Sequence, residues 1–150
     1  MKVSEVLKNK GAGVEVTVPD MSIGEVASLL MEKRIGSLVV CDESGQVTGI
    51  VTERDIVKGL SSYGQKVLKQ RASDLMSKAL VCTPEVDVGQ VMRVMTNDRV
   101  RHLVVMAGDE LRGIVSIGDV VQSRLDQCQL EVNVLRDYVR VGPSPRRRFA

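Results

Sequence analysis

Two short motifs combine a hydroxyl with a carboxylate three residues later, at points where a strand is expected to meet a helix. Thr52 precedes Asp55, and Ser116 precedes Asp119. At a helix N-terminus, free backbone N–H groups and the positive end of the helix dipole attract a phosphate, and a hydroxyl adds a hydrogen bond. A carboxylate at this place can accept two hydrogen bonds from the cis-diol of a ribose. Each motif is therefore a candidate site for a nucleoside phosphate.

The same spacing also has a purely structural interpretation. Ser/Thr-x-x-Asp is close to a capping box, in which the two side chains satisfy only the N–H groups of their own helix. The residue types alone leave both interpretations open.

Other residues that commonly do chemistry are few and scattered. Cys41, Cys82 and Cys128 form no C-x-x-C pair, and the single histidine, His102, has no metal-ligand partner nearby in the sequence. We therefore predict no metal site and no disulfide. The chain also lacks a recognisable pair of nucleophile and base, so we predict that it is not an enzyme.

Composition narrows the class of protein further. With 150 residues, of which 43% are hydrophobic, the chain can bury a core without disulfides or a structural metal. Apolar runs such as residues 38–41 are far shorter than the roughly 20 residues that cross a bilayer. Residues 1–5 do not resemble a secretory signal, so a cytoplasmic location without membrane contact is expected. One Phe, two Tyr and no Trp disfavour a protein that stacks single-stranded nucleic acid.

The two motifs occupy matched positions of an internal repeat. An offset of 65 residues aligns residues 38–40 with 103–105. After a one-residue deletion, an offset of 64 aligns Asp55 with Asp119. Such duplication indicates one supersecondary unit copied so that each copy covers the apolar face of the other.

The sequence pattern of each copy predicts five elements in the order strand, helix, strand, strand, helix. Ser22 and Asp87 are typical caps for the first helix, and β-branched runs around Gly-containing turns indicate hairpins. The predicted strands are 16–18, 37–42 and 47–51 in the first copy and 81–83, 102–106 and 111–115 in the second, the closing helices are 53–60 and 117–130, and stretches 2–9 and 64–76 have helical potential.

The unit, its duplication, and residues 49–55 echoed by 113–119 resemble a tandem pair of CBS domains, also called a Bateman module, of the small stand-alone bacterial type. The resemblance covers roughly residues 1–130. It implies an α+β fold of two βαββα repeats packed with pseudo-two-fold symmetry. We expect repeat 1 and its lead-in at 1–63, a linker helix and repeat 2 at 64–132, and a basic, disordered tail at 133–150.

This resemblance also implies a function. Members of the family are regulatory modules that bind adenine nucleotides between the repeats and signal to a partner protein through the inter-repeat geometry. The implied ligand is AMP first, then ATP or NAD(H), with S-adenosylmethionine as a further candidate, and no catalytic cofactor is implied. Family members tend to form homodimers, and symmetric pairs are the commonest oligomers.

Carried onto this sequence, the resemblance implies two unequal clefts, with ribose held by the aspartates and phosphate by the hydroxyls. If His102 contacts phosphate, affinity should rise on acidification. The better-equipped cleft would use Ser116, Asp119, Arg101 and His102, with the base against Ala12, Gly13, Gly36 and Ser37. The other would use Thr52, Arg54 and Asp55, with the base near Met76, Ser77, Val100 and Arg101.

An alternative function rests on the C-terminal charge. Residues 136–150 carry five arginines against one aspartate, and Arg146, Arg147 and Arg148 follow a Gly-Pro-Ser-Pro stretch. Such a segment could bind the phosphate backbone of nucleic acid while the repeats act as a dimeric scaffold. Steep salt dependence that disappears on deleting residues 142–150 would distinguish this alternative.

Overall fold

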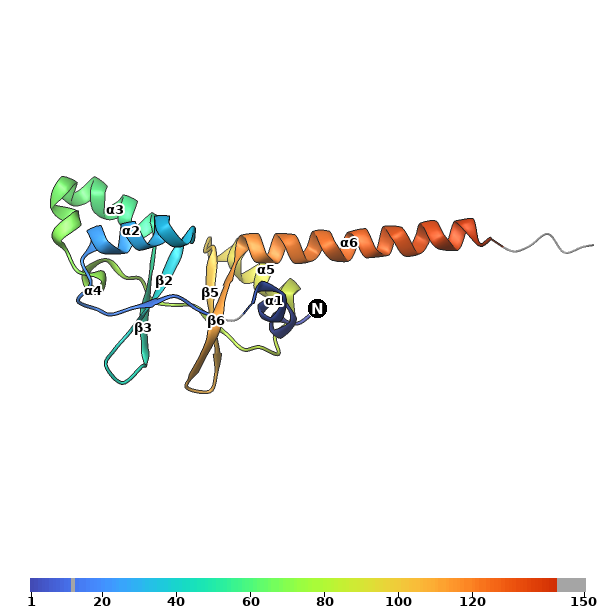
Figure 1. The fold of residues 1–150 in the computed structure, drawn as a ribbon, viewed down its shortest axis with the longest axis horizontal. Coiled ribbons are helices and arrows are strands. Elements are labelled where there is room, and N and C mark those ends of the chain that lie inside the picture. Colours follow the sequence, from blue (N-terminus) through green and yellow to red (C-terminus); the bar gives the residue numbers. More distant parts are fainter. Residues whose placement is uncertain (12, 143–150) are drawn as a thin grey trace, which may run out of the picture.

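The computed structural model describes residues 1–11 and 13–142, which form two three-stranded sheets of identical topology. In the first sheet, β1 (Val16–Thr17) pairs in parallel with β2 (Ser37–Cys41), which pairs antiparallel with β3 (Val47–Thr52). In the second, β4 (Val81–Cys82) pairs in parallel with β5 (His102–Ala107), which pairs antiparallel with β6 (Glu110–Ser116). The mixed α/β fold with a duplicated βαββα unit is confirmed (Figure 1).

The predicted caps begin the helices of both repeats. The backbone N–H of Glu25 donates to Ser22 Oγ over 3.2 Å, and that of Gly89 donates to Asp87 Oδ1 over 2.8 Å. No helix in the described part of the chain is both long and apolar enough to cross a membrane. The helices are α1 (Val3–Lys10), α2 (Ile23–Lys33), α3 (Glu53–Tyr63), a 3₁₀ helix (Gly64–Lys69), α4 (Ala72–Leu75), α5 (Val88–Asn97) and α6 (Ile117–Arg140).

Alternation along the strands gives each sheet two buried faces. In β2, Leu38 and Val40 pack beneath α2, whereas Val39 points to the opposite face. There Val39 meets Ile50 and Val104, and all three are buried. Val39 and Val104 correspond under the 65-residue offset, so the contact between the sheets is built from equivalent positions.

The lead-in helix α1 packs with the second repeat rather than the first. Val3 and Val6 are buried in one cluster with Leu103 and Val115. The backbone N–H of Val3 donates to the carbonyl of Val86 over 2.9 Å. The lead-in of the predicted unit 1–63 therefore packs with the core of the other repeat.

The segment that links the repeats packs with the first repeat, just as α1 packs with the second. Val67 and Ala72, from the segment between the repeats, are buried against Leu38 and Val51 of the first repeat. The first part of the predicted unit 64–132 thus packs with the core of the first repeat. Local apolar spacing indicates that a segment needs a core, but it does not specify which of two equivalent cores it joins.

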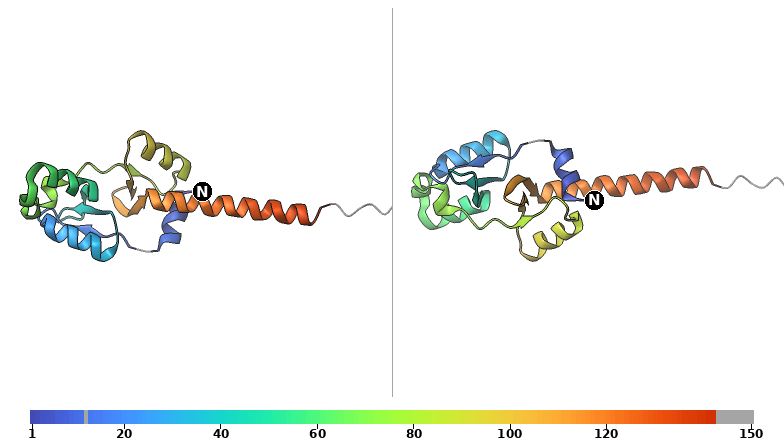
Figure 2. Two further views of the ribbon diagram at one scale, coloured as in Figure 1. Left: turned by 90° about the horizontal axis from the view of Figure 1, so that it is seen from above. Right: turned by 90° about the horizontal axis from the view of Figure 1, so that it is seen from below.

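Helix α6 is longer than predicted. It runs to Arg140, so residues 133–140 are helical and the expectation of a disordered tail from residue 133 is wrong for them (Figure 2). The sequence offers no Gly or Pro between Gly118 and Gly142, and Pro143 follows, so the helix meets its first strong breaker there. Residues 143–150 of the predicted tail lie outside the described part of the chain.

Candidate functional site

Both hydroxyl–carboxylate motifs form capping boxes at helix N-termini. Thr52 is the N-cap of α3, and Ser116 is the N-cap of α6. The N–H of Asp55 donates to Thr52 Oγ1 and that of Asp119 donates to Ser116 Oγ, each over 3.2 Å. Capping therefore occurs at both places. Whether a ligand can also bind depends on what else each carboxylate contacts.

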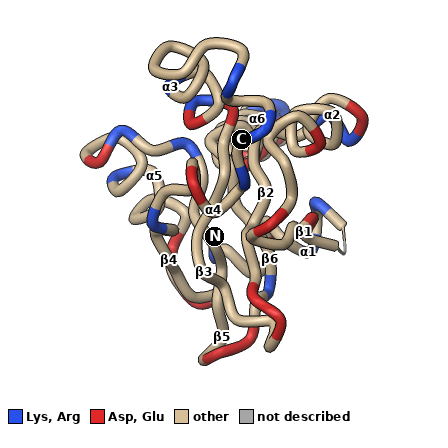
Figure 3. Tube along the Cα trace, turned by 90° about the vertical axis from the view of Figure 1, so that its left-hand side faces the viewer, with Lys and Arg blue, Asp and Glu red and all other residues tan. Residues whose placement is uncertain are grey.

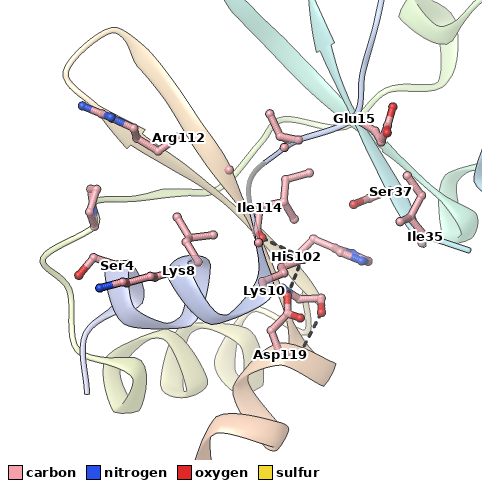
Figure 4. A pocket seen from close by; sticks show the side chains of 18 of the residues that line it. Ser4, Lys8, Lys10, Glu15, Ile35, Ser37, His102, Arg112, Ile114 and Asp119 are labelled. Carbon is pink, nitrogen blue, oxygen red and sulfur yellow. Dashed lines mark hydrogen bonds and ion pairs between the residues drawn. The ribbon is translucent and has the colours of Figure 1, made fainter. Parts of the chain in front are cut away.

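Asp119 keeps part of its carboxylate accessible. Its Oδ2 accepts the N–H of Ser116 over 2.8 Å and the ammonium of Lys10 over 2.8 Å. Lys10 Nζ also donates to the carbonyl of Ile114 over 3.1 Å (Figure 4). No donor among the described residues is paired with Oδ1. Burial opposes ionisation, but the hydrogen bonds from Lys10 and Ser116 outweigh it and lower the pKa of Asp119.

Asp55 is instead fully engaged within the protein. Its Oδ1 accepts the hydroxyl of Ser77 over 2.6 Å. Its Oδ2 accepts the N–H and the hydroxyl of Thr52 over 2.9 and 3.0 Å. The residue is only 9% exposed. These contacts favour a structural role for Asp55, so the equivalent positions of the two repeats are chemically different.

The Asp119 cleft is a cavity of about 1160 Å³ between α1 and the second repeat on one side and residues 34–37 on the other (Figure 4). Predicted residues that line it are Ser116, Asp119, His102, Gly13, Gly36 and Ser37. Ala12 lies outside the described residues. The placement of Arg101 in this cleft is wrong, because Arg101 lines the other one.

The Asp55 cleft, lined by residues of both repeats, has a volume of about 640 Å³. Predicted residues that line it are Thr52, Arg54, Asp55, Ser77, Val100 and Arg101. The placement of Met76 there is wrong. Its side chain packs against the core of the first repeat, and its Sδ would lie 2.9 Å from a Cβ added to Gly49.

His102 and Gly36 separate the two clefts and line both of them. A Cβ added to Gly36 would lie 3.2 Å from His102 Nε2, a distance at which one of the two groups has to move. The absence of a side chain at Gly36 therefore lets the imidazole sit between the repeats. Burial, followed by the positive charge of Lys10, lowers the pKa of His102.

We predict that the stability of the fold depends on pH through His102. The charges of Lys10, Glu53, Asp119 and Arg101 all act on the pKa of this side chain. Its folded-state pKa lies below the unfolded value of about 6.5, so the unfolded chain binds this proton first. The unfolding free energy should therefore fall as pH drops below that value. Chemical denaturation of wild type and His102→Gln across this pH range tests the prediction, and identical pH profiles for the two proteins would contradict it.

Several cations of these clefts escaped sequence analysis. Lys10 reaches the Asp119 cleft because α1 packs with the second repeat, and its signal was the basic last turn of that helix. Arg34, the C-cap of α2, and Arg99, which follows the Asp98 C-cap of α5, have φ of 55° and 52°, a left-handed conformation uncommon for non-glycine residues. Their signal was the match under the 65-residue offset. The missed cations are Lys8, Lys10, Arg34 and Arg112 in the Asp119 cleft and Lys58, Lys78 and Arg99 in the Asp55 cleft.

Comparison with known proteins identifies the class. The family model named CBS domain matches residues 13–62 and 72–126. The chain therefore belongs to the CBS domain family and carries two copies of the domain, which confirms the resemblance seen in the sequence.

Individual relatives extend over most of the chain. The CBS-domain containing protein ATU1752 from Agrobacterium tumefaciens is 43% identical, with a TM-score of 0.80 over 82% of this chain and 92% of that one. The mitochondrial CBS domain-containing protein CBSX3 of Arabidopsis thaliana is 30% identical and is matched over 93% of this chain and 72% of its own length. The CBS domain protein PAE2072 from Pyrobaculum aerophilum, solved in complex with AMP, is 24% identical with a TM-score of 0.71, over 79% of this chain and 89% of that one.

Proposed function

We propose that this protein is a non-catalytic regulatory module that binds an adenine nucleotide, with AMP as the preferred ligand, in the Asp119 cleft. The observation that carries the proposal is the state of Asp119. It is an ionised carboxylate at a helix N-terminus, with one oxygen that no described donor occupies and a lysine 2.8 Å from the other. The AMP complex of the Pyrobaculum relative supports this choice of ligand.

The residues of the cleft suit the parts of a nucleoside monophosphate. Asp119 can accept the ribose cis-diol, while the N-terminus of α6 and Ser116 can receive the phosphate. Lys10 can neutralise phosphate charge once it leaves Asp119, so binding would exchange one ion pair for another. Gly13, with φ of 120° and no atom within 4 Å of an added Cβ, leaves backbone open to a planar base.

Charge ranks S-adenosylmethionine below the phosphate-bearing candidates. A volume of about 1160 Å³ exceeds that of the Asp55 cleft, about 640 Å³, and Lys8, Arg34 and Arg112 also line the larger one. These cations would accommodate the further phosphates of ATP or NAD(H). S-adenosylmethionine carries no phosphate and would leave Lys10 without an anionic partner, so it ranks last.

Regulation follows from where the cleft lies. A nucleotide held by Asp119 and Ser116 of the second repeat and by Gly36 and Ser37 of the first would contact both repeats. It could bias their relative position, to the extent that its affinity differs between the two arrangements. An effector protein or domain would then respond to that geometry.

The charge pattern favours a small ligand over nucleic acid. Lys and Arg lie interspersed with Asp and Glu over the Cα trace (Figure 3). The cluster of positive charge that could attract the phosphate backbone of a nucleic acid is formed by the arginines at 146–148. These residues lie outside the described part of the chain.

A thermal-shift comparison tests the proposed function. Ligand that binds only the folded state stabilises it by about 2.7 kcal/mol at 100 times its Kd. We expect AMP to raise the melting temperature in a concentration-dependent manner. The shifts should be smaller for GMP, which carries guanine in place of adenine, and for adenosine, which lacks the phosphate. Equal shifts with AMP, GMP and inorganic phosphate would overturn adenine recognition.

A further inference from the structure

Helix α6 extends well beyond the rest of the molecule. Its first turns pack against α1, α5 and β6, where Val120 and Ser123 are buried. From Cys128 to Gly142 every residue is exposed, and the helix continues as a free rod (Figures 1 and 2). A lone helix of fewer than about 12–15 residues is marginal in water, so intrachain contacts do not account for this half of α6.

The rod is also unusually apolar for a helix without neighbours. Leu135 is 64% exposed and Val139 is 78% exposed. Single exposed apolar side chains are common on protein surfaces. A continuous row of them on one face of a helix instead indicates a binding partner. The exposed apolar residues of this half are Leu130, Val132, Val134, Leu135, Tyr138, Val139 and Val141.

One row follows the heptad spacing of a coiled coil. Leu125, Cys128, Val132, Leu135 and Val139 are separated alternately by three and four residues, as the a and d positions of a heptad are. We name these five residues the α6 stripe. Because a helix turns about 100° per residue, the stripe lies away from the face that carries Val120 and Ser123. The body of the protein would therefore not obstruct a second helix on the stripe.

The residue types along the stripe specify the number of strands. Val132, Val139 and Leu125 fall at a positions, and Leu135 and Cys128 fall at d positions, so two of the three a residues are β-branched. β-branched residues at a with leucine at d favour two parallel strands. Exposed Ile117 and Val121 continue the same face toward the body, so the contact need not end at Leu125.

The charges beside the stripe specify the direction. Glu131 falls at a g position and Arg136 at the following e position. In a parallel pair a g residue faces the e residue five places later on the other helix, so Glu131 of each copy would face Arg136 of the other. We propose that a second copy of this chain binds the α6 stripe, forming a parallel two-stranded coiled coil. This inference is independent of nucleotide binding.

The proposal places the two Cys128 side chains in the same layer of the coil. Cys128 is exposed in the single chain, whereas Cys82 is buried and Cys41 is partly buried. Mild oxidation with copper phenanthroline should give a disulfide-linked dimer that Cys128→Ser abolishes. The double variant Cys128→Ser/Leu130→Cys carries its thiol on the opposite face and should cross-link far less. Equal cross-linking by both thiols, or none through Cys128, would overturn the parallel pairing.

Light scattering gives a second, non-covalent test. We expect the reduced protein to have twice the 16.4 kDa mass of the chain at micromolar concentration. Leu135→Asp should weaken the dimer about 10-fold or more, which is 1.4 kcal/mol or more, whereas Val134→Asp, equally exposed but off the stripe, should not. A monomeric wild type, or a dimer equally sensitive to both variants, would overturn the proposal.

Charge exchange tests the orientation separately from the contact. Glu131→Arg and Arg136→Glu should each weaken the dimer, and the double variant should recover the wild-type dimer affinity. Single variants without effect, or a double variant weaker than either, would contradict the assigned g–e pairing.

Discussion

Replacing Asp119 with alanine is expected to reduce AMP affinity about 100-fold, because two hydrogen bonds between carboxylate and ribose are lost at about 1.5 kcal/mol each. Lys10 remains available to the phosphate, so weak binding should persist. Isothermal titration calorimetry measures the change directly. The effect should appear in the affinity and not in the number of sites.

Three variants separate ribose binding from helix capping. Asp119→Asn keeps an acceptor for the N–H of Ser116 and should lose less affinity than Asp119→Ala. Asp55→Ala, at the matched position, should change AMP affinity less than threefold, or about 0.6 kcal/mol, because Thr52 and Ser77 already occupy its carboxylate. Asp126→Ala, at an exposed position on α6, should have no effect. A larger loss for Asp55→Ala than for Asp119→Ala would assign the ligand to the other cleft.

The largest effect on stability is expected at the core of the second repeat. Leu103 is 2% exposed and packs with Val3 and Val115. Leu103→Ala should lower the unfolding free energy by about 2–5 kcal/mol, since the transfer term and the remaining cavity add. At about 2–4 °C per kcal/mol for a chain of this size, the melting temperature should fall by about 4–20 °C.

Two further leucines provide the comparison. Leu38 holds the equivalent position of the first repeat and is fully buried, so Leu38→Ala should cost a similar amount. Leu130 is 66% exposed, and Leu130→Ala should change stability by no more than about 0.5 kcal/mol. Chemical denaturation of the three variants measures all of these values. A loss at Leu103 no greater than that at Leu130 would contradict the assigned core.

Local interactions explain what could be predicted from the sequence. Strand alternation places Leu38 and Val40 on one face, and the caps at Thr52 and Ser116 involve residues only three apart. Such features depend on neighbours along the chain, so the repeats, their strands and both capping boxes are readable without a fold. The glycine and proline at residues 142 and 143 also marked the end of α6, although the prediction ended the helix too early.

The partners of the site depend on long-range packing instead. Lys10 reaches Asp119 only because α1 joins the core of the second repeat, 109 residues away in sequence, and an equivalent core was available in the first. Arg101 and His102 are neighbours in sequence, but His102, the first residue of β5, lines both clefts, whereas Arg101 lines only the Asp55 cleft.

The sequence by itself thus determined the repeated units and the two hydroxyl–carboxylate motifs, because hydrogen bonding and burial within each unit are local. Only the tertiary structure decided that Asp119 retains an accessible oxygen beside Lys10 while Asp55 is bound by Ser77. The physical reason is that the two motifs are nearly identical as local structures, and segments distant in the chain supply the charges and hydroxyls that make them different.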